Sequence, residues 1–221
     1  MVSSKHAFWI ALVFTLAVFI FGLVMGFFIE TQRAGQVQKN LIASELNMLD
    51  EQLRNRVNER FNISCESSVS DTFNFAERIF HEAAKMETYD ASSNLDDTLK
   101  LLHKRYDLLR LMLWTEAIEL KQKCSKEFHI AVYIYAYGIE DISKKSMQSS
   151  MERLLIDFKN KYGDEILLIP MAGNLELGAI NKVLDYYEIS ADELPVVVID
   201  EKIVLKGLVT FDELEKTIIV R

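Results

Sequence analysis

The chain opens on a long apolar run that contains no charged residue. It extends from Ala7 to Ile29, after a short polar tail of residues 1–6. A helix of this length rises roughly 34 Å, which is enough to cross a hydrocarbon core of about 30 Å. Trp9 lies near one end, where an interfacial aromatic residue is expected. The pattern predicts one transmembrane helix over residues 7–29, in contact with the lipid bilayer.

The apolar run is longer than the core of a typical secretory signal, and no clear cleavage motif follows it. We therefore interpret it as an uncleaved signal anchor. Lys5 on one side and Arg33 and Lys39 on the other give almost no orientation bias. Gly22 and Gly26 have the spacing that lets two membrane helices approach closely, so a homo-oligomer is one option.

The region from residue 30 to residue 127 has the pattern of long helices. It contains neither proline nor glycine after Gly35, as helix interiors prefer. A turn is predicted at 88–94, where Ser92, Ser93 and Asn94 can each cap the following helix, and a softer break is expected at Ser64–Ser70. We expect an antiparallel, coiled-coil-like helical hairpin that forms a stalk over residues 30–127. Apolar residues spaced alternately by four and three mark its seams: Ile42, Leu46, Leu49 and Leu53; Val69, Phe73, Ala76, Phe80 and Ala83; Leu95, Leu99, Leu102, Tyr106, Leu109 and Leu113.

Two cysteines, Cys65 and Cys124, are almost level across this hairpin. Modest bending would bring them within bridging distance, so we expect a disulfide at the hairpin base; two unrelated thiols are the alternative. A disulfide requires an oxidising compartment, which favours an extracytoplasmic body. Asn62 begins a glycosylation sequon that such a location would expose. His81 and His103 could face each other, but histidines and acids are common on solvated helices, and we expect no metal site.

From residue 128 the pattern changes to apolar strands alternating with helices. Such strands predict an α/β domain with a sheet covered on both faces. Ser143 is expected to cap the first helix and Gly163 to end it, and Thr210 and Glu213 form a capping box. The expected strands are 129–137, 165–170, 195–200 and 203–205, and the expected helices are 143–162, 175–187 and one that follows Thr210.

The stretch VLDYYEISADELPVVVIDEKIVLKG, from Val183 to Gly207, resembles the thioredoxin family. The resemblance covers residues 128–221 and is most specific at Pro195 and Gly207. It implies a thioredoxin-like fold and a cis Leu194–Pro195 bond facing a groove. The catalytic cysteines of that family would fall near residues 140–143, where this chain has no sulfur, so dithiol chemistry is excluded there.

Family members without the cysteines commonly bind or space other proteins, which is what the resemblance implies for this chain. The loop beside the proline could pair with an extended peptide. Alternatively, its residues merely close the core. The expected groove residues are Tyr137, Gly138, Ile139, Glu140, Asp141, Leu194 and Pro195.

The formal net charge of −8 argues against nucleic acid as a partner, because phosphate binding needs a basic surface. No nucleophile has a base beside it, so we expect no catalytic residues and no cofactor. The leading hypothesis is a membrane-anchored, redox-inactive protein that binds or scaffolds another membrane or envelope protein. One alternative is an accessory thiol–disulfide component that uses Cys65 and Cys124. The other is a purely structural oligomer.

Overall fold

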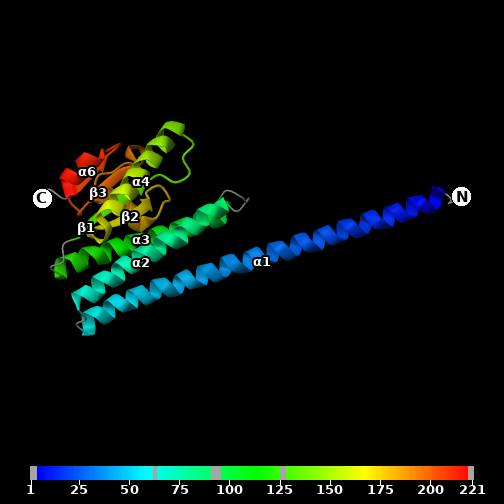
Figure 1. Ribbon diagram of the computed structural model, residues 1–221, viewed down its shortest axis with the longest axis horizontal. Coiled ribbons are helices and arrows are strands. Elements are labelled where there is room, and N and C mark those ends of the chain that lie inside the picture. Colours follow the sequence, from blue (N-terminus) through cyan, green and yellow to red (C-terminus); the bar gives the residue numbers. More distant parts are fainter. Residues whose placement is uncertain (1–3, 62–63, 91–95, 125–127, 219–221) are drawn as a thin grey trace. The chain divides into compact units, whose positions relative to one another are not determined.

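The computed structural model describes residues 4–61, 64–90, 96–124 and 128–218 (Figure 1). The chain divides into two compact units, residues 1–50 and residues 51–221. The sequon at Asn62 and the centre of the expected turn near residue 92 lie outside the described residues.

Helix α1, Ser4–Phe61, contains the apolar segment. Its stretch Phe8–Thr31 has a mean hydropathy of 2.7 and is long and apolar enough to cross a membrane or to act as a signal sequence. The hydroxyls of Thr15 and Thr31 donate to carbonyls one turn earlier in the helix, at 2.8 Å and 3.0 Å. These bonds satisfy the polar groups of the segment internally, as an apolar surrounding requires.

The second unit is an α/β domain. Its strands form a mixed four-stranded sheet in the order β2-β1-β3-β4, in which β1 is parallel to β2 and antiparallel to β3. Every strand expected from the sequence is present, with ends shifted by one or two residues. The elements are α2 Cys65–Asp90, α3 Asp96–Lys123, β1 His129–Tyr135, α4 Ile142–Tyr162, β2 Ile166–Ala172, α5 Gly178–Tyr186, β3 Val196–Ile199, β4 Ile203–Lys206 and α6 Phe211–Ile218.

Helices α4 and α6 cover one face of the sheet. Side chains alternate between the faces along a strand, and those of Ala131, Tyr133 and Val197 pack here with Met151 and Phe158 of α4. Gly163 ends α4 with a φ of 55°, as expected from the sequence. The capping box of α6 also forms, because the amide of Thr210 donates to the carboxylate of Glu213 and the amide of Glu213 donates to the hydroxyl oxygen of Thr210.

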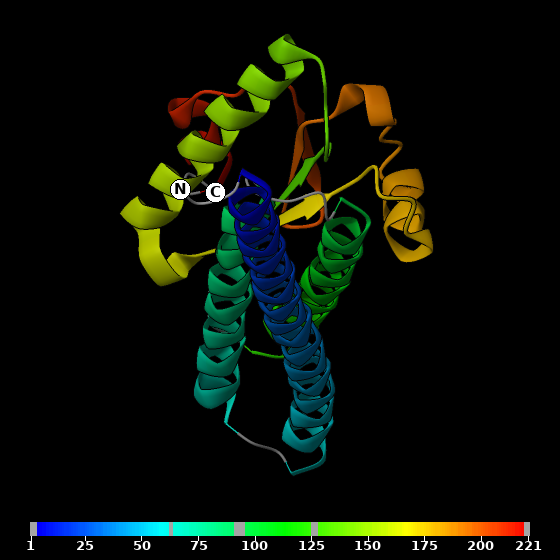
Figure 2. The same ribbon diagram turned by 90° about the vertical axis from the view of Figure 1, so that its right-hand side faces the viewer.

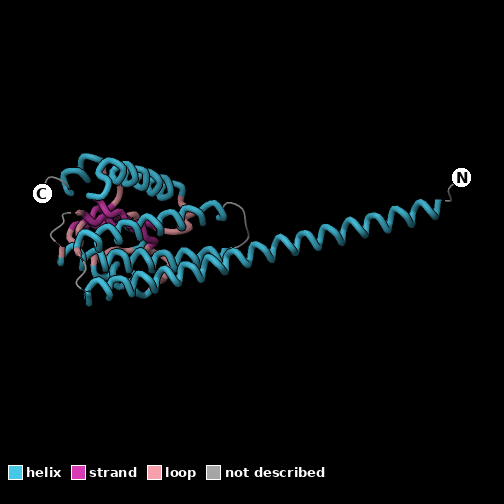
Figure 3. Tube along the Cα trace, turned by 60° about the horizontal axis from the view of Figure 1, so that its bottom comes forward, coloured by secondary structure: helices cyan, strands magenta, loops and turns pink. Residues whose placement is uncertain are grey.

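Helix α3 covers the opposite face of the sheet (Figures 2 and 3). The intervening β1 residues Ile130, Val132 and Ile134 are fully buried, as are Leu109 and Ala117 of α3. The hairpin α2–α3 therefore belongs to the same compact unit as the strands. The boundary expected between residues 127 and 128 falls within this unit.

A disulfide joins Cys65, at the start of α2, to Cys124, just after α3. The two Cα atoms are 5.7 Å apart, which confirms the pairing expected from the hairpin. The softer break in the helical pattern was expected at Ser64–Ser70, and α2 begins at the start of that range. Ser64 caps the helix, because its side-chain oxygen accepts a hydrogen bond from the amide of Ser67 at 3.4 Å.

Asp200 ties three elements together at the turn between β3 and β4. Its carboxylate accepts from Lys121 of α3 at 2.5 Å and from the amide of Ile130 at 2.9 Å, and lies 2.7 Å from His129 Nδ1. Burial alone would raise the pKa of Asp200, but these hydrogen bonds outweigh it and hold the pKa below its ordinary value. The charged carboxylate therefore stabilises the contact between α3 and the sheet.

Removing the disulfide should destabilise the folded body. The bridge closes a long loop, since its cysteines are 59 positions apart. We expect Cys65→Ala/Cys124→Ala to lower the free energy of unfolding by about 4 kcal/mol, measured by denaturant titration of the full chain in neutral detergent. Reductant should destabilise the wild type by a similar amount and leave the variant unchanged. Equal stability of the two proteins would show that the bridge is not structural.

Asp200→Asn should cost about 1–3 kcal/mol of stability at pH 7. Because the folded pKa is lowered, the contribution of Asp200 is complete above its ordinary pKa and is lost as the pH falls through the folded value. The difference between wild type and variant should therefore shrink from about pH 5 towards pH 2. Unfolding titrations across this range measure it, and a difference independent of pH would contradict the assigned role of the charge.

Candidate functional site

The residues of the expected groove gather beyond the carboxyl end of β1. The segment 137–141 follows β1, and Leu194–Pro195 precedes β3, whose Val196 pairs with Ile134. Lys144 at the start of α4 donates to the carbonyl of Asp192 at 3.4 Å, which joins the two segments. The Leu194–Pro195 bond is cis, as the resemblance implied.

Several of these residues have structural roles. Leu194 is 3% exposed and its side chain packs close to Gly173, where an added Cβ would lie 3.1 Å from it. Pro195 is also buried, whereas Glu140 and Asp141 are exposed. Ser143 is not the cap of α4. Asp141 caps the helix instead, because its carboxylate accepts from the amides of Ser143 and Lys144 at 2.8 Å and 3.2 Å.

Tyr137 is held by two residues that the sequence did not single out for this groove. Asn174 accepts from its amide at 2.7 Å and donates to its carbonyl at 2.8 Å. The ring of His103, on α3, lies 4.2 Å from the Tyr137 ring. His81 is instead exposed on α2, with its Nε2 3.7 Å from Glu77. No cluster of three possible metal ligands occurs among the described residues.

A buried ion pair between Asp107 and Arg110 lies on the same face of α3 as His103. Asp107 is 0% and Arg110 8% exposed at the side chain, and the atoms Nη1 and Oδ1 are 3.1 Å apart. Burial raises the pKa of Asp107, although Arg110 opposes the shift. Neither charge can reach water freely, so each depends on the other for compensation.

Breaking this pair on one side should cost more than replacing both partners. We expect Asp107→Leu and Arg110→Met each to lower the free energy of unfolding by about 3–5 kcal/mol, because each leaves one buried charge uncompensated. The double variant should be more stable than either single variant. Denaturant unfolding of the four proteins gives the coupling, and strictly additive losses would show that the two charges act independently.

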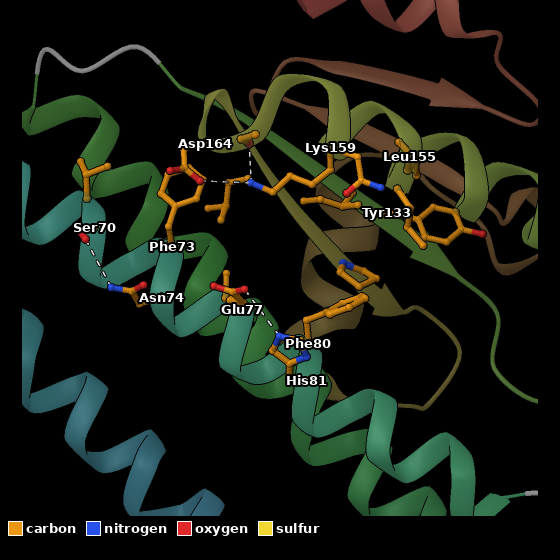
Figure 4. Close-up of a pocket in the computed structure, with 18 of the residues that line it drawn as sticks. Ser70, Phe73, Asn74, Glu77, Phe80, His81, Tyr133, Leu155, Lys159 and Asp164 are labelled. Atoms are coloured by element: carbon orange, nitrogen blue, oxygen red, sulfur yellow. Dashed lines mark hydrogen bonds and ion pairs between the residues drawn. The ribbon is translucent and has the colours of Figure 1, made fainter.

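A cleft lies between α2 and α4 in the second unit, and no sequence argument located it. Its volume is about 740 Å³ (Figure 4). Phe73 and Phe80 enter it from α2, and Leu155 and Lys159 from α4. Phe80 remains 50% exposed, although it belongs to a seam expected to be buried. The described residues thus leave part of the Phe80 side chain uncovered.

The cleft has apolar walls and a largely acidic rim. Among the described residues, the carboxylates of Glu66, Glu77, Glu152 and Asp164 line it, together with Lys159 and His81. The ammonium group of Lys159 lies 5.0 Å from the centre of the Phe73 ring and donates to the carbonyl of Gly163 at 2.5 Å. Burial lowers the pKa of Lys159, while Asp164, 3.9 Å away, acts against the shift. The ammonium group of Lys159 is thus already bound by the Phe73 ring and the Gly163 carbonyl at the side of the cleft.

The floor of the cleft is strand β2, which contributes Leu167, Leu168 and Pro170. In the sheet order, β2 is an edge strand that pairs with β1 alone. An edge strand presents backbone groups that can pair with another chain. The cleft therefore combines apolar walls, negative charge and a strand with one free side in the described sheet.

A scan against protein-family models, a search of curated proteins and a search of solved structures each found no match to this chain.

Proposed function

We propose that this chain is a single-pass membrane protein whose body binds a segment of another membrane or envelope protein in the cleft between α2 and α4. The size and lining of this cleft are the main support for the proposal. Its volume of about 740 Å³ lies in the range typical of ligand sites. It offers exposed aromatic surface at Phe80 beside a charged rim, a combination suited to recognising a polypeptide.

The proposal includes a thioredoxin-like body without redox function. The order strand, helix, strand, helix, strand, strand, helix from β1 to α6 supports the resemblance, as does a proline that opens the third strand. The positions from Glu140 to Ser143 carry no thiol, so the groove beside Pro195 cannot exchange disulfides. The body then acts through binding and not through catalysis.

The apolar part of α1 would serve as the anchor, with the body on the extracytoplasmic side. The disulfide between Cys65 and Cys124 supports this orientation, because such bridges persist in oxidising compartments. Both cysteines lie at helix ends and close the base of the hairpin, which supports a structural role. Cys124 is only 5% exposed, so its sulfur is poorly placed for exchange with a partner thiol.

A structural oligomer remains the second candidate because the α1 stripe Ile42, Leu46, Leu49 and Leu53 is at least half exposed. The stripe and the pair Gly22 and Gly26 point about half a turn apart on this helix. One straight contact between two copies cannot bury both surfaces. An oligomer would have to use them against different neighbours.

Photo-cross-linking from the cleft tests the proposed function. Full-length protein carrying p-benzoylphenylalanine in place of Phe73 or Phe80 is irradiated in its native membranes. We expect a discrete adduct with a second polypeptide from both positions. The control carries the probe at Tyr186, which is exposed on α5 outside the cleft lining. No adduct from the cleft, or equal adducts from all three positions, would contradict the proposal.

A further inference from the structure

We propose that the cleft receives an extended, basic segment of its partner, which adds as a strand to the free edge of β2. This inference rests on the proposed function and specifies the chemistry of the ligand. It departs from the groove beside Pro195, where the sequence placed peptide pairing.

The register of β2 identifies the backbone groups available at its edge. The amide of Gly173, just after β2, donates to the carbonyl of Tyr135 at 2.8 Å, so this residue faces β1. Backbone direction alternates with a period of two. Leu167, Ile169 and Met171 therefore also face β1, while Leu168 and Pro170 face outward. The amide of Ile166 already bonds to Gly163 at the preceding turn.

An added strand would consequently meet the N–H and C=O of Leu168 together with the carbonyls of Ile166 and Pro170. Pro170 has no N–H, so pairing centres on Leu168. Both Leu168 and Pro170 line the cleft and are only half-buried. The helices α2 and α4 flank this edge and supply apolar contacts for the side chains of an incoming strand (Figure 4).

The charge of the lining selects a basic ligand. Among the described lining residues, four carboxylates face the cleft, whereas the ammonium group of Lys159 is held by the carbonyl of Gly163 and by the ring of Phe73. Lysine or arginine side chains on the incoming strand would lie against Glu66, Glu77 and Glu152. A second copy of this chain pairing edge to edge would bring two acidic rims together, which like-charge repulsion opposes. The occupant is therefore a basic segment of a different protein.

Defined peptides test the charge and the backbone pairing separately. The full chain in neutral detergent is titrated into fluorescein-labelled (Lys-Val)4 and (Glu-Val)4 amides, and binding is followed by anisotropy. We expect the glutamate peptide to bind at least about tenfold more weakly, and the lysine peptide to weaken as salt increases. Glu77→Gln should weaken the lysine peptide, whereas Glu188→Gln, outside the cleft lining, should not. Equal affinity of the two peptides would overturn the inference.

N-methylation then tests the strand pairing. Two isomers of (Lys-Val)4 are used, one methylated on every lysine amide and one on every valine amide. Only alternate amides of a strand face its neighbour, so one isomer should lose binding at least about tenfold more than the other. Equal affinity of the two isomers would show that no strand is added.

A matched pair of variants identifies the edge. Leu168→Pro removes the outward N–H, whereas Leu168→Ala removes a comparable part of the side chain and keeps the N–H. We expect Leu168→Pro to reduce peptide affinity at least about tenfold relative to Leu168→Ala. Equal affinities would place the peptide elsewhere. The N-methyl isomers decide the question independently if Leu168→Pro fails to fold.

The cross-linking and peptide experiments distinguish failure of the proposed function from failure of strand addition. Adducts from Phe73 and Phe80, combined with peptides that show neither charge nor N-methyl discrimination, would retain the proposed function and reject strand addition. Discriminating peptide binding without any adduct in native membranes would support the edge site and reject the proposed cellular partner.

Discussion

The sheet has two apolar faces, and the rest of the second unit depends on covering both. Helices α4 and α6 cover one face, and α3 covers the other, where Ile130, Val132 and Ile134 would otherwise meet water. Burying such side chains contributes about 1.5–3 kcal/mol each. Helix α3 is therefore part of the core of the sheet. Asp200 and the disulfide secure the end of this helix.

This constraint also creates the cleft. Because α3 lies on the sheet, its hairpin partner α2 is placed beside the edge strand β2, with α4 on the other wall (Figure 4). The bridge from Cys65 to Cys124 fixes the start of α2 to the end of α3. The cleft is thus built on a covalently closed helical hairpin.

Much of the fold could be predicted from the chain. Continuous apolar runs predicted the four strands that the structure describes. Local residue types predicted the end of α4 at Gly163 and the capping box at Thr210, and the hairpin pattern predicted the disulfide. Ser143 was wrong as a cap because Asp141, two residues earlier, offers a carboxylate to the same free amides. Side-chain chemistry within one turn of a helix does not decide between two neighbouring caps.

The cleft could not be predicted in the same way. Its walls come from residues near 73 and 159, which no local pattern connects. The exposed edge of β2 depends on the order of strands, and apolar strands read alike whether central or at an edge. Phe80 was assigned to a buried seam because periodicity reports a face but not what covers it.

The most direct test of the account is the state and location of Cys65, the exposed end of the bridge. Intact cells are treated with a membrane-impermeant maleimide, with and without an impermeant reductant. The account predicts labelling of Cys65 only after reduction, which requires both a disulfide and an extracytoplasmic body. Labelling without reductant, and only after the membrane has been opened, would contradict it and place a reduced body in the cytoplasm.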